Sequence, residues 1–268
     1  MVPVIHLVRH AQGYHNLSAE NQWIRDPDLT DHGKKQCEEL CKKFPYQDKI
    51  THLVASPMRR TIYTCILSFA PAVKAGKKII ALPDAQEVSL YPCDIGTNLN
   101  QLKQEFGDLV DFRFVSEDWN RKTPDSKYYP ESQKLEARAR SVRIWLRDLI
   151  KDAEADAQVV LVTHGGFLHF LTEDWSGINP GRGTGWENTE YRSYKFADQT
   201  GQDPNASLEE LPESRRRRQG SEIPLTEAEQ MEMRAAYETV LEHDLKECLD
   251  RIALQAAAKN AANGTNGV

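Results

Sequence analysis

The sequence has no long apolar run, and this absence argues against a membrane-spanning segment. Its 268 residues are 40% hydrophobic and 28% charged, close to the average of soluble proteins. No apolar run approaches the roughly 18 residues that suggest a membrane helix. Residues 1–8 are apolar, but they lack the basic start and the small-residue cleavage site of a signal peptide. We therefore predict a cytoplasmic protein without a membrane partner.

Paired cysteines are also missing. The five cysteines are odd in number and scattered, without C-x-x-C spacing: Cys37, Cys41, Cys65, Cys93 and Cys248. This pattern argues against a disulfide framework and favours a reducing, intracellular compartment. Cys37 and Cys41 lie four residues apart on an expected helix, but no second His/Cys pair lies near them, so helix packing is favoured over a metal site.

The chain lacks an excess of positive charge. Its formal net charge is −6, whereas proteins that bind nucleic acid usually carry a basic balance, so we do not expect a nucleic-acid partner. Any phosphate must therefore be bound by cations gathered locally. The run Arg215–Arg218 leaves a nuclear location or a polyanion-binding patch open, beside the simpler interpretation as a solvated linker.

What the sequence does contain is an alternation of buried strands and amphipathic helices. Apolar runs predict strands at 4–8, 52–55, 78–82 and 158–163, and helical spacing predicts helices at 34–44, 56–70 and 135–150. Thr30 or Asp31 is expected to cap the first helix and Ser56 the second. Residues 189–196 are expected to add an edge strand. The pattern predicts a three-layer α/β/α fold around a doubly wound, mostly parallel sheet.

Two stretches depart from the alternation. Residues 84–134 are irregular and rich in aromatic residues, and we interpret them as an inserted, partly helical cap bordering a site. Residues 199–224 are polar and are interpreted as a linker. A C-terminal helix is expected over 225–258, with a disordered tail from Asn260 and a stripe from Tyr237 to Ile252 that packs on its own domain. The main domain is thus expected to occupy residues 1–198.

Reactive side chains follow three of the predicted strands. Ligands of open α/β sheets bind at the carboxyl ends of the strands. Arg9-His10 follows the first strand, Ser56 to Arg60 the second, and His164-Gly165-Gly166 the last. Two histidines and several arginines are therefore expected to meet at one edge without metal-ligand spacing.

These motifs together resemble branch 1 of the histidine phosphatase superfamily, the phosphoglycerate mutase-like proteins. They keep that family's order over residues 4–170, and the matching positions are Arg9-His10 with Asn16, Leu29-Thr30 with Gly33 and Gln36, Ser56, Met58, Arg60, Thr64, Glu87, and Thr163-His164-Gly165. Spacing favours Arg60 over Arg59 as the pocket arginine, which leaves Arg59 free to reach solvent or the cap.

The resemblance implies a phosphoryl-transfer site. In-line displacement at a phosphate monoester needs a nucleophile, a proton donor for the leaving oxygen and fixed positive groups around the phosphoryl oxygens. The roles implied are a phosphohistidine on His10, general acid and base catalysis by Glu87, and phosphoryl binding by Arg9, Arg60 and protonated His164, with Asn16 as a lesser contact. The expected partner is a small phosphorylated substrate, with no metal or organic cofactor.

Two details bear on which reaction is expected. Ala11 replaces the usual glycine after the nucleophile, which requires a negative φ at that residue. Mutases of the family carry a Glu-Arg-x-Tyr-Gly segment near the acid, and residues 86–91 do not match it. Hydrolysis is therefore favoured. A phosphoglycerate mutase-type phosphotransferase and a catalytically idle binding or regulatory member remain the alternatives, and sugar phosphates, other metabolites, diphosphates and phosphoproteins all remain open as substrates.

Overall fold

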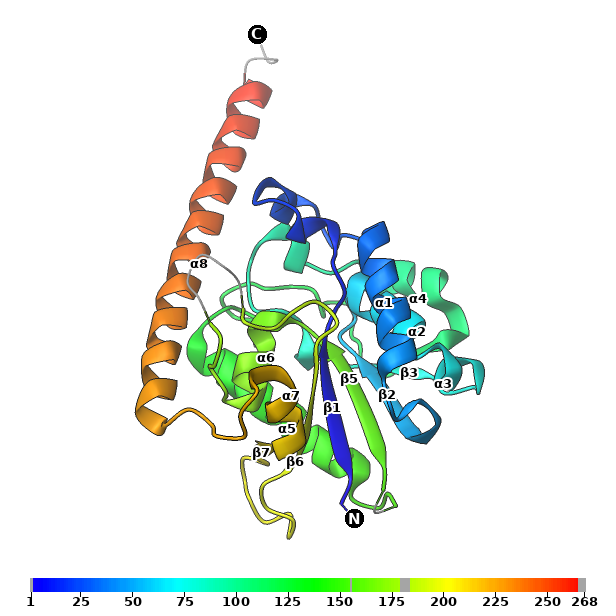
Figure 1. Ribbon diagram of the computed structural model, residues 1–268. Helices are drawn as coiled ribbons and strands as arrows, with labels where there is room; N and C mark the ends of the chain where they lie inside the picture. Colours follow the sequence, from blue (N-terminus) through cyan, green and yellow to red (C-terminus); the bar gives the residue numbers. More distant parts are fainter. Residues whose placement is uncertain (1, 155, 179–183, 265–268) are drawn as a thin grey trace.

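The computed structural model describes residues 2–154, 156–178 and 184–264, and its centre is a seven-stranded sheet (Figure 1). The strand order is β4-β3-β2-β5-β1-β6-β7. The strands are β1 (Val4–Arg9), β2 (Ile50–Ala55), β3 (Ile79–Ala81), β4 (Val110–Asp111), β5 (Gln158–Thr163), β6 (Tyr191–Phe196) and β7 (Leu208–Glu210).

The five strands from β4 to β1 run parallel, and β6 and β7 are antiparallel additions. This confirms the predicted doubly wound, mostly parallel sheet. The expectation that residues 189–196 form the edge was wrong, because β7 pairs with the outer side of β6. The fold therefore extends beyond residue 198.

Helices cover both faces of the sheet (Figure 1). They are α1 (Asp31–Lys43), α2 (Arg59–Ser68), α3 (Ala70–Lys74), α4 (Leu99–Phe106), α5 (Ser132–Ile150), α6 (Gly165–Thr172), α7 (Pro212–Gln219) and α8 (Glu227–Gly264). Side chains of β5 alternate between the faces: Val159 and Leu161 pack with α5 and α6, whereas Val160 and Val162 pack with α2 and α4. Alternation of side chains along a strand thus gives two hydrophobic layers, as expected of a sheet buried on both faces.

The two expected helix caps had different outcomes. The Thr30 hydroxyl accepts a hydrogen bond from the Gly33 N–H at 2.9 Å and caps α1, as predicted. Ser56 caps nothing: α2 begins at Arg59 with Met58 as its N-cap residue. The Ser56 side chain instead contacts His164 in the site described below.

The segment 84–134 is more closely joined to the domain than a cap would be. Helix α4 and the residues that follow it pack into the second hydrophobic layer, and β4 extends the sheet. Trp119 is fully buried, and a Cβ on Gly96 would lie 2.1 Å from its ring, so this close approach requires glycine. Only the first part of the segment, around residues 87–94, reaches the site.

The linker interpretation of residues 199–224 was wrong, because this stretch holds β7 and α7. The reason lies in charge pairing that composition does not reveal. Arg218 donates to Asp174 at 2.6 Å and to buried Glu210 at 2.7 Å. The Arg217 guanidinium lies 4.0 Å from the centroid of the Tyr191 ring. Arg215 also pairs with Glu210, at 3.2 Å, so three of the four arginines of the basic run are anchored to the domain.

Helix α8 packs on the domain with its first turns and projects beyond it at its far end (Figure 1). Tyr237 and Leu241 join the first hydrophobic layer, and Cys248 is buried in a small separate cluster. Ile252, the last member of the predicted stripe, is 48% exposed. The helix continues to Gly264, past the predicted start of the disordered tail, whose residues 265–268 lie outside the described residues. No helix in the described part of the chain is long and apolar enough to cross a membrane.

Candidate active site

A cavity of about 610 Å³ lies at the carboxyl ends of the parallel strands. The predicted site residues that line it are Arg9, His10, Asn16, Arg60 and Glu87. The sixth, His164, lies behind His10, with 5.2 Å between the ring centroids. Strand ends far apart in the sequence thus bring all six side chains together, as the topology predicted.

His10 has the geometry of a nucleophile. Its Nδ1–H donates to the Ala11 carbonyl at 2.7 Å, which leaves the lone pair on Nε2 available. Burial, together with the positive charges of Arg60 and Arg9, holds the pKa of His10 well below its usual value. His10 is therefore a neutral imidazole, the form that attacks phosphorus.

The loop that carries His10 is fixed from several directions. The Ala11 N–H donates to the Thr64 hydroxyl at 3.0 Å, and the Asn188 amide donates to the His10 carbonyl at 2.9 Å. A Cβ on Gly33 would lie 2.2 Å from the Gln12 carbonyl oxygen, so only glycine lets α1 pack so closely on this loop. Ala11 is not among the described residues with positive φ, so the condition placed on its replacing glycine is met.

Arg60 is the centre of a buried network. Its guanidinium is fully buried and donates to the Cys93 carbonyl at 2.6 Å, to Asp94 at 2.8 Å and to His164 Nδ1 at 3.1 Å. Burial raises the pKa of Asp94, but the charges of Arg60 and Lys122 outweigh it, so the pKa lies below its usual value. Arg60 and Asp94 therefore form a buried ion pair.

The state of His164 differs from the expectation. A guanidinium can only donate, so His164 Nδ1 must be unprotonated, and its Nε2–H donates to the Ser56 hydroxyl at 2.9 Å. Burial, with the charge of Arg60, holds the pKa of His164 well below its usual value. His164 is neutral in this geometry, and the predicted protonated form needs a dianionic phosphate beside it.

Glu87 lies at the first turn of α6. Its carboxylate accepts hydrogen bonds from the N–H groups of Gly166 at 3.1 Å, Phe167 at 2.9 Å and Val88 at 3.0 Å. Burial and the neighbouring Asp94 carboxylate raise the pKa of Glu87, and these effects outweigh Arg60 and the N–H donors. A carboxyl group with a raised pKa can hold a proton closer to neutral pH, which suits a general acid.

Of the remaining residues, Arg9 and Asn16 line the cavity and Arg59 does not. The Arg9 guanidinium donates to the Trp186 carbonyl, and its buried Nε–H has no partner within the described residues. Asn16 is exposed, and its side-chain oxygen accepts from the Gly13 N–H at 3.0 Å. Arg59 lies outside the lining and pairs with Glu105 on α4 at 2.9 Å, as expected for an arginine that reaches the inserted segment.

Sequence reasoning missed several residues of the site. His15 lies beside the nucleophile, with 5.3 Å between the ring centroids, and the sequence pattern assigned it no role. Lys122 supports the acid loop by donating to the Glu87 and Ser89 carbonyls at 2.8 and 2.9 Å. Burial lowers its pKa to about 7. Asp94 and Lys122 stand in no periodic pattern, and the predicted stripe through Tyr237 gave no sign that α8 borders the cavity. Only the fold could place Asp94, Tyr237 and Asp244 in the lining and Lys122 beside Glu87.

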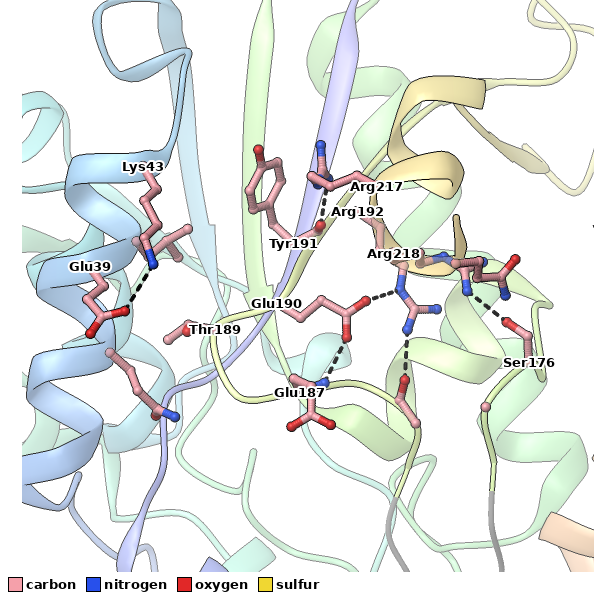
Figure 2. A pocket seen from close by; sticks show the side chains of 15 residues that line it. Glu39, Lys43, Ser176, Glu187, Thr189, Glu190, Tyr191, Arg192, Arg217 and Arg218 are labelled. Atoms are coloured by element: carbon pink, nitrogen blue, oxygen red, sulfur yellow. Dashed lines mark hydrogen bonds and ion pairs between the residues drawn. The ribbon is translucent and has the colours of Figure 1, made fainter. Parts of the chain in front are cut away.

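A second cavity of about 550 Å³ lies between α1, β6 and α7 (Figure 2). Its cations already have partners: Lys43 pairs with Glu39 at 3.1 Å and Arg192 with Glu190 at 2.6 Å. Arg218 is held by the carboxylates named above. Arg217 lies over the Tyr191 ring. Since three of these four cations are paired with carboxylates, the histidine cavity is the better phosphate site.

Comparison with known proteins agrees with this geometry. The family model of the histidine phosphatase superfamily (branch 1) matches residues 5–204. A phosphoglycerate mutase-like protein of Arabidopsis thaliana is 27% identical over 211 residues, which cover 62% of this chain and 72% of that protein. Phosphoglycerate mutase-like protein 1 of the same plant is 24% identical over 200 residues, covering 61% and 68%.

Solved structures share the fold at low sequence identity. The ecdysone phosphate phosphatase of Bombix mori, in complex with tungstate, has a TM-score of 0.52 and 15% identity, covering 78% of this chain and 92% of that one. The phosphoglycerate mutase of Bacillus anthracis str. Sterne has a TM-score of 0.50 and 17% identity, covering 78% and 91%. One of these folds carries a phosphatase and the other a mutase, so the shared architecture does not choose between the two reactions.

Proposed function

The chain belongs to branch 1 of the histidine phosphatase superfamily, and on that premise we propose that it hydrolyses a phosphate monoester through a phosphohistidine on His10. Membership supports a phosphatase or mutase-like activity in general. The observation that carries the finer proposal is a neutral His10, with Nε2 free, in one cavity with Glu87, a carboxyl group of raised pKa.

In the first step the His10 Nε2 lone pair attacks phosphorus and the ester P–O bond breaks. Glu87 gives its proton to the leaving oxygen, so the alcohol departs neutral. The Arg9 and Arg60 guanidinium groups and His164 lie around the nucleophile, where they stabilise charge on the phosphoryl oxygens. The product of this step is a phosphohistidine and an ionised Glu87.

In the second step water attacks the phosphohistidine. The Glu87 carboxylate accepts a proton from this water as the P–N bond breaks, and both His10 and Glu87 return to their starting states. Inorganic phosphate leaves. A mutase would instead keep the phosphoenzyme until a second hydroxyl replaced water as the acceptor.

The test is hydrolysis of an aryl phosphate in excess EDTA by the wild type and by His10→Ala. Loss of the nucleophile should lower kcat by roughly 10⁴-fold or more. Rapid alkaline quenching with ³²P-labelled substrate should trap an acid-labile phosphoenzyme in the wild type alone. His32→Ala is the matched control, because His32 is exposed on α1 and lies outside the cavity lining.

The outcomes separate the alternatives. EDTA-resistant turnover that needs His10 supports the hydrolase. The mutase predicts a different result: once primed by a bisphosphate, the protein would move phosphate between the hydroxyls of a phosphoglycerate faster than it hydrolyses that ester. This result would contradict the hydrolase. No turnover and no phosphoenzyme across a panel of esters would contradict both and leave the binding or regulatory member.

A further inference from the structure

The histidine cavity has a wall that belongs to the C-terminal helix. Tyr237, Leu241 and Asp244 of α8 line it, at spacings of four and three residues that place them on one face of the helix. A phosphate group fills only a small part of about 610 Å³, so this wall must face the rest of the substrate.

Gly166 shows that this wall lies at the leaving-group side. A Cβ built on Gly166 would lie 2.5 Å from the Tyr237 hydroxyl oxygen and 2.7 Å from Glu87 Oε1. Both atoms therefore border the same small space. Because Glu87 is the group that protonates the leaving oxygen in the proposed mechanism, the side chains of α8 next to it face the departing alcohol.

Contacts farther along α8 hold the wall in place. The Tyr91 hydroxyl donates to Glu247 at 3.0 Å, and the Arg251 guanidinium lies 3.8 Å from the centroid of the Trp23 ring. Cys248 is fully buried with Leu90, Tyr91, Cys93 and Tyr129. These contacts join α8 to the loop around Trp23 and to the loop around Tyr91, which both border the cavity. Asp244 is therefore held in the cavity wall.

Asp244 is a carboxylate without a strong cationic partner. Its side chain is one-third exposed, and the side chain paired with it within the described residues is the exposed His243 imidazole, at 3.8 Å. Burial and the carboxylates of Glu247 and Asp94 raise the pKa of Asp244, so its ionised form gains from a cation beside it. The only lysine or arginine side chains among the described lining residues are Arg9 and Arg60, at the phosphate end.

We infer that Asp244, with Tyr237 and Leu241, forms a leaving-group subsite that selects phosphate monoesters of amino alcohols. The cavity is cationic where the phosphoryl group binds and anionic at the α8 wall. A substrate with a phosphate at one end and an ammonium group at the other matches both ends. This inference rests on the proposed phosphatase function and adds the substrate class.

The test compares three esters of similar length: 2-aminoethyl phosphate, propyl phosphate and 2-carboxyethyl phosphate. The wild type should prefer the amino ester over the propyl ester in kcat/KM by roughly 10- to 100-fold, the range for a charge-assisted hydrogen bond. Asp244→Asn should bring this ratio close to one. Asp244→Lys should reverse it in favour of the carboxy ester, which simple loss of structure cannot do.

Glu242→Gln is the matched control, because Glu242 is exposed on the same helix and outside the lining. It should keep the wild-type ratio. Two outcomes would overturn the subsite and leave the phosphatase function standing. One is equal kcat/KM for the three esters, and the other is a ratio of amino to propyl ester that Asp244→Asn leaves unchanged. No hydrolysis of any ester, together with no phosphoenzyme, would overturn the phosphatase and the subsite with it.

Discussion

At the scale of single residues, the site works by separating the proton affinities of neighbouring groups. Burial and nearby guanidinium groups push the pKa of His10 down, whereas burial and Asp94 push that of Glu87 up. A neutral base and a protonated acid can then coexist in one cavity. Asp94 contributes to both shifts, since it accepts a hydrogen bond from Arg60 and its own negative charge disfavours ionisation of Glu87.

This separation predicts a shape for the pH dependence of kcat/KM on an alkyl phosphate. His10 must be neutral, and since its pKa is lowered, the acid limb should fall well below pH 6.5. Glu87 must be protonated for the first step, and since its pKa is raised above 4.5, the alkaline limb should lie above that value. The check is a pH–rate profile of the wild type and Glu87→Gln.

Glu87→Gln should lose roughly 10²- to 10⁴-fold on the alkyl ester, because the alkoxide then leaves without a proton. The loss should be smaller on an aryl phosphate, whose phenolate leaves readily. Full alkyl phosphatase activity in Glu87→Gln would show that another group is the acid.

At the scale of elements, α1 and the nucleophile loop form one rigid unit. Gly33 lies at the first turn of α1 against the Gln12 carbonyl, and Thr30 of the same turn donates to the Gln12 side chain at 2.8 Å. Any side chain at position 33 must push the loop away from the helix. The glycine of this motif is therefore needed for packing, since it is not among the residues with positive φ.

Gly33→Ala should therefore lower both stability and activity. A Cβ 2.2 Å from a backbone oxygen forces a shift of the loop, for which we expect a cost of about 1–3 kcal/mol in the free energy of unfolding. Because His10 moves with the loop, kcat should fall more than KM rises. Urea unfolding and steady-state kinetics measure the two effects; a variant with unchanged kcat and unchanged unfolding midpoint would show that the loop relaxes freely.

The secondary-structure elements also show what the sequence could predict and why other elements could not be predicted. Strands β1, β2 and β5 are largely apolar, and His10 and His164 directly follow two of them, so pattern alone placed both. Strand β7 and helix α7 were missed because they are stabilised by pairing, not by an apolar stripe: Glu210 is buried only because arginines of α7 neutralise it. The composition of such a stretch therefore predicts a polar linker.

At the scale of the whole molecule, the two hydrophobic layers, the sheet and α8 together build one cavity from distant parts of the chain. Tyr237 and Glu87 are distant in sequence, yet both side chains lie next to Gly166. No local pattern carries that information. The acidic wall at Asp244 escaped prediction for this reason.

The same burial makes the whole fold sensitive to acid. His6, His10, His15 and His164 are all held neutral, and burial lowers the pKa of His6 to about 4. In the unfolded chain these histidines titrate near 6.5, so below that pH the unfolded state binds more protons than the folded state. The contribution of these histidines to stability should therefore be complete above about pH 6.5 and should fall as the pH drops, by about 1.4 kcal/mol per pH unit for each histidine.

Glu87, Asp26 and Asp244 act in the opposite direction, because their raised pKa values let the folded state take up protons first, but they are fewer than the histidines. Urea unfolding between pH 7.5 and 5 measures the net slope. His6→Gln should make it shallower, since His6 bonds to Ser193 and Gln158 well away from the cavity lining and its removal deletes one titrating group. An unfolding midpoint that stays constant or rises as the pH falls from 7.5 to 5 would show that these histidines are protonated in the folded protein, and it would remove the neutral His10 on which the proposed mechanism depends.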